Sequence, residues 1–433
     1  MLDTRAVCIQ RDAIEQGYDL LEEHLEAGPW LVAADANTWE AAGERFVDVL
    51  DAAGRDWVRF EVEAEPGDKY PICTDELVSD CQAEMVEHGC SSGIAVGSGT
   101  INDTVKMAAH NVDRPMAVVG TAPSMNGYTS GIAAILSEGV KTTNPCTAPR
   151  VVIADLDVMA EAPARMICSG LGDLMSKPVS NSDWAMSARL NGTPHSAEAM
   201  EIIEEGAAAL EGVAPRLPER DREAIGGLVN SLMLSGIAMS VAGSSSPASG
   251  GEHLISHHID MTAHAFDQPY DFHGCQVGVG TLTSALFYEQ LRAFDPGQLD
   301  IDERVDALPD WASYESMLRE RFGPLFDAVV QHAEPGYPTP QQMRRRLEKL
   351  VDEWDEVLEE TGRTLRTRQS LEDELDSANC PTRFADLDVD RDRARRAILH
   401  SKDIRNRYTI LHLAWELGTL EEWGERALAE LYE

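Results

Sequence analysis

The first third of the chain alternates short apolar runs with amphipathic helical segments, and this alternation restricts the possible folds strongly. Apolar runs that suit strands occupy residues 30–34, 57–62, 92–96, 115–120 and 150–154. Helical periodicity fills the intervals 38–53 and 75–88, and residues 1–28 read as an irregular lead-in with a short helical pattern. Strands that alternate with helices are typical of a parallel sheet with helices on both faces. The sequence therefore predicts an α/β fold for this region, with a hairpin at residues 131–143.

A glycine-rich turn follows the run 92–96. It consists of Gly97, Ser98, Gly99, Thr100, Ile101, Asn102 and Asp103. Such a turn between a strand and a helix lets backbone N–H groups approach a phosphate at the helix N-terminus. Asn102 stands where the dinucleotide fingerprint has its third glycine, and a lone GxG after a strand is more often only a turn. Thr100 and Asp103 have the spacing of a capping box.

A second polar loop follows the run 115–120. It begins with Thr121, Ala122, Pro123 and Ser124, passes Asn126 and reaches Ser130. Open α/β sheets bind ligands at the carboxyl ends of their strands. A polar loop in this place is often only a turn, but two such loops on consecutive strands favour a nucleotide site.

From about residue 163 the pattern becomes helical. Asp173 lies in a mostly apolar segment, where an acid needs a metal or a partner such as Lys177 at i+4. His253, His257, Asp260 and His264 are spaced i, i+4, i+7 and i+11, which places them on one stripe of a helix. This stripe fits a metal site or a solvated polar face, and spacing cannot decide whether His253 pairs with His257 or with His273. Residues 285–433 read as charged amphipathic helices, with a Pro-rich linker or lid at 334–340.

The charge of the chain excludes general binding to nucleic acid or to anionic membranes. The 433 residues carry 75 acidic and 36 basic side chains, a formal net charge of −39. A phosphate site must therefore be built from local groups. The chain has no apolar run of the ~20 residues that a membrane span needs, and no signal peptide is expected. Eight cysteines without a CxxC pair predict free thiols in a reducing cytoplasm.

Five motifs carry a specific resemblance because they occur in one order. They are residues 97–103, 121–124, 170–177, 251–257 and 273–280. This series resembles the sn-glycerol-1-phosphate dehydrogenases, a branch of the iron-containing alcohol dehydrogenase and dehydroquinate synthase superfamily. The match runs from about residue 28 to 290, and residues 402–418 resemble the end of the longer bacterial-type members.

The resemblance implies a Rossmann-like NAD(P)-binding domain at residues 1–160 and an all-α metal-binding domain at 161–433, with a helical extension from about 290. It implies a divalent metal (Zn, or Ni or Fe) held by Asp173, His253 and His273. It implies catalytic and substrate contacts from Asn126, Asp173 and His257. It implies contacts to NAD(H) or NADP(H) from the turn at 97–103 and from Thr121, Ala122, Pro123, Ser124 and Ser130.

The implied activity is reduction of dihydroxyacetone phosphate to sn-glycerol 1-phosphate, a lipid precursor, by a homodimer or higher homo-oligomer. Alternatives on the same scaffold are a glycerol or other polyol dehydrogenase, a dehydroquinate-synthase-like cyclase and a non-catalytic relative. The chain departs from the family at Asn126, where an aspartate is usual.

An acid after the second strand favours NAD, and Glu61, Glu63 and Glu65 lie there with Arg59 nearby.

Overall fold

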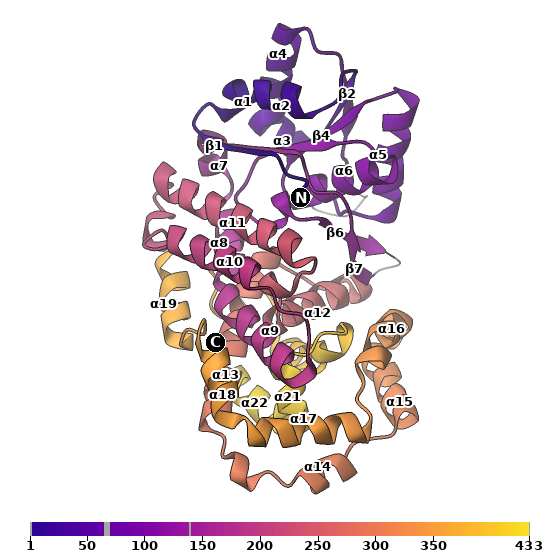
Figure 1. Ribbon diagram of the computed structural model, residues 1–433. Coiled ribbons are helices and arrows are strands. Elements are labelled where there is room, and N and C mark those ends of the chain that lie inside the picture. The colour runs from indigo at the N-terminus through magenta and orange to yellow at the C-terminus, as the bar shows by residue number, and fades with distance from the viewer. Residues whose placement is uncertain (1, 65–69, 138–139, 433) are drawn as a thin grey trace. The chain divides into compact units, whose positions relative to one another are not determined.

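The computed structural model describes residues 2–64, 70–137 and 140–432, which form two compact units (Figure 1). Unit 1 contains Met1–Leu174 and Glu201–Ser244, and unit 2 contains Met175–Met200 and Ser245–Glu433. The chain therefore leaves unit 1, returns to it once, and then completes unit 2. A functional boundary at residue 160 stays a prediction.

Unit 1 is built on a six-stranded sheet in the order β1-β8-β5-β4-β2-β3, with every neighbouring pair parallel. This confirms the predicted α/β fold. The strands are β1 (Ala6–Gln10), β2 (Trp30–Ala34), β3 (Trp57–Glu61), β4 (Ser92–Gly97), β5 (Met116–Gly120) and β8 (Val151–Asp155). The lead-in assigned to residues 1–28 was wrong at β1, an edge strand whose exposed residues interrupt its apolar pattern.

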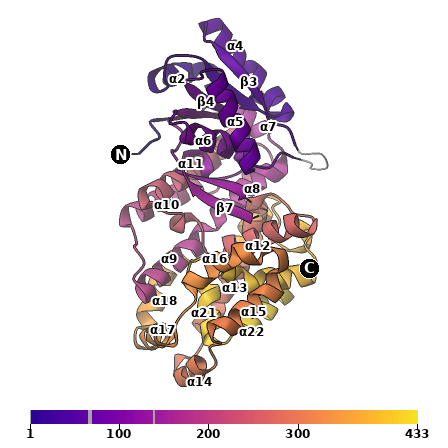
Figure 2. The same cartoon turned by 90° about the vertical axis from the view of Figure 1, so that its right-hand side faces the viewer.

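Helices cover both faces of this sheet (Figure 2). On one face Trp30, Ile94 and Val96 pack with Phe46 and Leu50 of α4. On the other face a Cβ at Gly93 would lie 2.8 Å from Val105 of α6. Burial on both faces explains why β2, β4, β5 and β8 read as continuous apolar runs. The helices are α1 (Ala13–Gln16), α2 (Tyr18–His24), α3 (Ala36–Thr38), α4 (Glu44–Ala53), α5 (Asp75–Glu87), α6 (Gly99–Asn111) and α7 (Leu156–Glu161).

The strand order reverses between β2 and β4. From β2 the chain moves to β3 on one side, and it then returns to β4 on the other. Ligands of open α/β sheets bind outside the carboxyl ends of the strands at such a switch point. Gly97 at the end of β4 is in register with Gly120 at the end of β5, so both polar loops leave the sheet at one level. The predicted hairpin is present as β6 (Ile132–Ser137) and β7 (Val140–Pro145).

Three longer helices complete unit 1: α8 (Ala164–Met175), most of α10 (Ala197–Ala209), and α11 (Arg222–Ala242). Among the described residues, α11 is the helix whose length and apolar composition match a membrane span. However, 61% of its most apolar window is buried in the protein, and the core helix of a soluble protein meets the same criteria.

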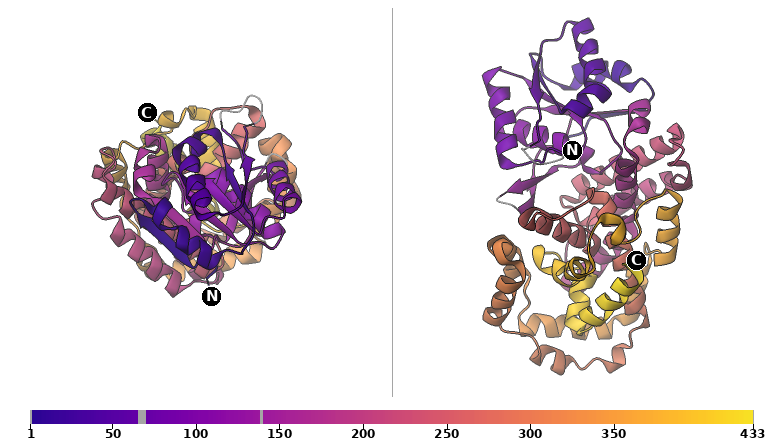
Figure 3. Two further views of the ribbon diagram at one scale, coloured as in Figure 1. Left: turned by 90° about the horizontal axis from the view of Figure 1, so that it is seen from above. Right: turned by 180° about the vertical axis from the view of Figure 1, so that it is seen from behind.

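All regular secondary structure in the described residues of unit 2 is helical (Figure 3), as predicted for the C-terminal part. Its centre is the pair α12 (Gly251–Phe266) and α13 (His273–Ala293), which approach so closely that a Cβ at Gly280 would lie 2.5 Å from the Glu252 carbonyl oxygen. Around this pair lie α9 (Lys177–Asn191), α14 (Ile301–Asp306), α15 (Trp311–Phe322), α16 (Phe326–Gly336), α17 (Pro340–Asp352), α18 (Trp354–Gly362), α19 (Arg368–Ser377), α20 (Arg391–His400), α21 (Ile410–Leu417) and α22 (Leu420–Leu431).

The Pro-rich stretch at 334–340 is not a free linker. Helix α16 continues through Pro335 to Gly336, and α17 begins at Pro340. Between them the Tyr337 hydroxyl donates to the Pro309 carbonyl oxygen at 2.7 Å. The stretch is thus a packed helix-to-helix connection.

Candidate functional site

The turn after β4 presents an uncapped helix N-terminus. Helix α6 begins at Gly99, and its N-cap residue Ser98 makes no side-chain bond to the first turn. The predicted capping box was wrong: Thr100 Oγ1 donates to the Pro71 carbonyl oxygen at 3.2 Å, and Asp103 Oδ2 accepts from the Ala134 amide at 2.9 Å. Backbone N–H groups without a side-chain cap are what an anion at a helix N-terminus binds.

Lys106 holds this turn in place, and the sequence analysis did not single it out. Its side chain is fully buried, and Nζ donates to Asp103 Oδ1 at 3.1 Å, to Gly127 O at 2.9 Å and to Ile132 O at 2.8 Å. One ammonium thus joins the glycine-rich turn, the loop after β5 and β6. In the sequence, Asp103 and Lys106 are spaced i, i+3 on a predicted helix, and this spacing could have indicated their ion pair.

The two predicted cofactor loops lie against each other. A hydrogen bond joins the Ser98 and Ser124 hydroxyls. The Tyr128 hydroxyl donates to the Ala122 carbonyl oxygen at 2.7 Å, and Ser130 Oγ donates to Gly127 O at 3.2 Å. Burial raises the pKa of Tyr128 to about 12, so this phenol stays a donor at neutral pH. The structure therefore brings the two loops together as one polar surface beside the switch point.

Asp173 lies next to Asn126 in unit 1. Asp173 is 1% exposed; its Oδ2 accepts from the Asn126 amide at 3.1 Å, and its Oδ1 accepts from Asn126 Nδ2 at 3.3 Å. Asn126 Nδ2 also reaches Ser235 Oγ at 3.3 Å. Gly170 makes this packing possible, because a Cβ there would lie 1.8 Å from the Pro123 carbonyl oxygen. Two of the predicted substrate contacts are thus neighbours, separated by 47 positions in the sequence.

Three histidine rings cluster in unit 2 on α12 and α13. The ring centroids of His253 and His273 are 5.2 Å apart, those of His257 and His273 are 5.3 Å apart and nearly stacked, and those of His253 and His257 are 6.1 Å apart. The helix α12 places His253 and His257 one turn apart, and α13 begins at His273. The predicted histidine positions are therefore adjacent within this unit.

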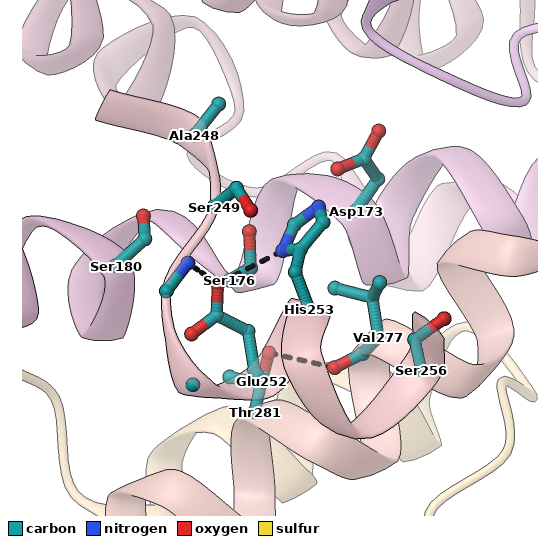
Figure 4. A network of polar contacts seen from close by, with 12 residues as sticks. Asp173, Ser176, Ser180, Ala248, Ser249, Glu252, His253, Ser256, Val277 and Thr281 are labelled. Atoms are coloured by element: carbon teal, nitrogen blue, oxygen red, sulfur yellow. Dashed lines mark hydrogen bonds and ion pairs between the residues drawn. The ribbon is translucent and has the colours of Figure 1, made fainter. Parts of the chain in front are cut away.

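Oxygen atoms of α12 lie within hydrogen-bond distance of two of these rings, and Figure 4 shows the contact at His253. His253 Nδ1 lies 2.9 Å from Glu252 Oε1, which also accepts from the Gly250 amide at 2.6 Å. His273 Nδ1 lies 3.0 Å from Ser256 Oγ. A histidine that ligates a metal through Nε2 usually donates its Nδ1 proton to a carboxylate or other oxygen. The histidine environment therefore fits a divalent metal. Glu252, adjacent to His253 in the chain, and Ser256 are functional candidates that the sequence reasoning missed.

The other two histidines of α12, His258 and His264, pack against aromatic side chains. His258 packs edge-on against Phe322, with centroids 5.8 Å apart, and burial lowers its pKa to about 3. His264 packs on Tyr270, with centroids 4.9 Å apart. Within the described ranges no group of three or more His, Cys, Asp and Glu side chains is arranged to hold a metal. The ligand set Asp173, His253 and His273 thus stays a prediction.

At the end of β3, a residue suited to NAD and one suited to NADP lie together. Arg59 Nη2 lies 3.4 Å from Glu61 Oε2, and its guanidinium lies 4.0 Å from the centre of the Trp39 ring. Glu65 lies outside the described residues. An acid that favours NAD and a cation that favours NADP are therefore paired with each other at this position.

Comparisons with known proteins agree with this geometry. A model of the iron-containing alcohol dehydrogenase family matches residues 8–163. The chain is 31% identical to a glycerol-1-phosphate dehydrogenase of Bacillus subtilis strain 168 that uses NAD(P)+, over 91% of this chain and 87% of that protein. It is 37% identical to a glycerol-1-phosphate dehydrogenase of Pyrococcus horikoshii, over 66% of this chain and 78% of that protein.

Solved structures share the fold at low sequence identity. A probable glycerol dehydrogenase from Sinorhizobium meliloti aligns with a TM-score of 0.62 and 17% identity, covering 98% of each chain. Glycerol dehydrogenase from Schizosaccharomyces pombe aligns with a TM-score of 0.63 and 16% identity, over 99% of this chain and 91% of that one. At such identity the likeness speaks for the architecture alone.

Proposed function

The chain belongs to the glycerol-1-phosphate dehydrogenase family, and from that membership we propose a metal-dependent, NAD(P)H-dependent reduction of dihydroxyacetone phosphate to sn-glycerol 1-phosphate. The observation that carries the proposal is the pair His253 and His273, whose Nδ1 atoms are both engaged by oxygens from α12. That arrangement is typical of metal ligands.

In the proposed site Asp173, His253 and His273 hold the metal. The turn at 97–103 and the loop at 121–130 bind the cofactor through backbone N–H groups, with Lys106 keeping the two loops in register. When bound, NAD(P)H supplies the hydride and the divalent metal supplies Lewis acidity toward the carbonyl. A carboxylate with two imidazoles is a ligand set that Zn²⁺, Ni²⁺ and Fe²⁺ all accept.

The chain's own residues then position the substrate and its proton. Asn126 is proposed to hydrogen-bond a substrate hydroxyl, because its amide both donates and accepts. His257, one helical turn from His253, is proposed to contact the substrate oxygen or phosphate. The proton that completes the alcohol at C2 comes from His257 or from water. The partner proposed with this activity is a second copy of the chain. The proposed location is a reducing cytoplasm, which suits the eight free cysteines.

A combined metal and activity assay tests the proposal. Elemental analysis of the purified protein is paired with oxidation of NADH or NADPH that depends on dihydroxyacetone phosphate, with glycerol and NAD(P)+ as the alternative substrate pair. His273→Ala should lose bound metal and activity together, whereas the control His264→Ala should keep both. Full activity in a metal-free His273→Ala protein would falsify the metal-dependent mechanism, and activity that needs no phosphate group would favour a polyol dehydrogenase.

A further inference from the structure

Unit 2 contains a polar cavity whose walls include none of the three clustered histidines. It has a volume of about 350 Å³ and lies between α9, the segment 335–342, and the segment 406–412. Ligand pockets of proteins range from about 300 to 1,000 Å³. The cavity is therefore large enough for a small metabolite.

The cavity wall carries a half-buried cation whose hydrogen-bond acceptors are neutral. Arg407 lines the cavity, and its guanidinium donates to the Ser249 carbonyl oxygen and, at 2.6 Å, to Ser245 Oγ. Both acceptors are neutral. Within the described part of the chain no carboxylate oxygen lies within salt-bridge distance of Arg407. A guanidinium stays charged and has five N–H donors, so this cation has unused capacity for an anion.

Two buried acids, Glu252 and Asp183, attract the Arg407 charge through space, and each accepts hydrogen bonds from other donors. Asp183, also on the wall, accepts from the Gly251 amide at 2.8 Å, the Ile410 amide at 2.7 Å and the Tyr288 hydroxyl at 2.7 Å. Burial raises the pKa of Asp183 to about 7, which further reduces its negative charge at neutral pH. Asp183 thus does not neutralise the cavity.

The second cation on the wall is balanced within the protein. Arg346 forms a two-bond ion pair with Glu416, and Tyr408 donates to the same carboxylate at 2.8 Å. Its guanidinium also donates to Asn191 Oδ1 at 3.3 Å. His412 adds no charge, since burial lowers its pKa to about 3. The positive charge open to a ligand therefore comes from Arg407.

We propose that this cavity binds a small phosphate-bearing anion through Arg407, separately from the histidine cluster. A tetrahedral phosphate offers several acceptor oxygens, and the planar fork of Arg matches two of them. Hydroxyl and amide side chains of Ser187, Thr193, Gln342 and Asn406 line the rest of the cavity and suit the remaining oxygens. In a chain of net charge −39, such a site must depend on a local cation. The proposal does not rest on the function proposed above.

Calorimetric titration of the full-length protein with inorganic phosphate tests the site. Arg407→Gln should weaken phosphate binding at least tenfold. Gln342→Glu places a negative charge on the wall but leaves Arg407 intact, and glutamate suits the capping box that Thr339 and Gln342 form. It should weaken phosphate binding in the same way without a folding defect. Arg345→Gln removes one exposed positive charge from the same helix and should leave binding unchanged.

Further measurements separate this cavity from the catalytic site. The KM for dihydroxyacetone phosphate should stay within twofold of the wild-type value in Gln342→Glu. Succinate serves as the carboxylate probe and should bind more weakly than phosphate. Phosphate binding that is unchanged in either Arg407→Gln or Gln342→Glu would overturn the proposal. So would binding of succinate alone, or a loss of phosphate binding that is matched by an equal rise in KM.

Discussion

The side chain at position 126 sets the charge beside Asp173. In the structure the Asn126 amide donates to Asp173 Oδ1 at 3.3 Å. An aspartate in its place would set two carboxylates at that separation, which is unfavourable unless a proton or cation is shared between them. Asparagine therefore lowers the negative charge that an anionic substrate meets.

We expect Asn126→Asp to lower kcat/KM for dihydroxyacetone phosphate about tenfold, which corresponds to ~1.4 kcal/mol. The loss should lie mainly in KM, because added negative charge repels the substrate phosphate. Steady-state kinetics across substrate concentrations measure this split. Asn111→Asp adds the same charge at an exposed position and serves as control. A large rate gain in Asn126→Asp would show instead that the asparagine impairs the reaction.

We expect Glu252 to control the orientation of the His253 ring. It is fully buried, and Oε1 accepts from both the Gly250 amide and the His253 ring. Glu252→Gln should weaken divalent-metal affinity about 10–100-fold, the usual effect of losing such a partner. Equilibrium dialysis with Zn²⁺ measures it. Unchanged affinity in a folded Glu252→Gln protein would remove Glu252 from the proposed metal site.

At the scale of elements, the packing of α8 on the loop after β5 depends on Gly170. Because a Cβ there would lie 1.8 Å from the Pro123 carbonyl oxygen, Gly170→Ala must displace either the helix or the loop. We expect it to lower the free energy of unfolding by about 3 kcal/mol, as overpacking does. NAD(P)H affinity should fall as well.

Gly226→Ala in α11 is the matched control for Gly170→Ala. A Cβ at Gly226 meets Leu156 at an ordinary 3.7 Å. It should therefore be neutral or stabilising by about 0.5–1 kcal/mol, since alanine favours a helix interior. Chemical unfolding of both variants measures the difference. Equal stability of the two would show that the loop yields without cost.

The N-terminus of α21 makes unit 2 sensitive to acid. The neutral ring of His412 accepts from the Thr409 amide at 3.2 Å, and burial, reinforced by Lys402, lowers the pKa of His412 to about 3. The unfolded chain binds a proton near pH 6.5 but the folded chain does not, so stability falls as pH drops from about 6.5 toward 3, by at most ~1.4 kcal/mol per pH unit.

His412→Gln should reduce this acid sensitivity. Glutamine at this position can still accept from the N-cap amide but does not titrate. Urea unfolding at pH 7 and pH 5 measures the effect, and the difference between the two pH values should be smaller in the variant. An identical pH dependence in both proteins would exclude His412 as a source of acid lability.

At the scale of the molecule, the net charge of −39 opposes the compact state through self-repulsion. Arg–Glu pairs such as Arg189 with Glu360 and Arg395 with Glu425 offset part of it. Exposed pairs contribute little each, so repulsion should dominate the salt dependence. We expect the melting temperature to rise by a few degrees between about 0.1 and about 1 M NaCl, as the Debye length falls from about 10 to 3 Å. A fall in melting temperature would mean that the ion pairs outweigh the repulsion.

Local patterns were enough to predict much of the fold and parts of the candidate site. The strands β2, β4, β5 and β8 are buried on both faces, and burial forces continuous apolar runs that can be recognised in a sequence. The edge strand β1 has exposed positions and therefore no such run. The two predicted cofactor loops could be recognised because each follows an apolar strand, and parallel strands end at one edge of a sheet.

What the sequence by itself determined is therefore the class of fold, the position of both loops and, through ordered motifs, the family. Only the tertiary structure decided which side chains act together. Lys106 contacts Gly127 and Ile132, Asn126 contacts Asp173, and Arg407 reaches Ser249. The physical reason is that a buried polar group needs a hydrogen-bond partner, and folding supplies that partner from a distant part of the sequence. In the contacts named here the partners are up to 158 positions apart, a separation that no local sequence pattern can indicate.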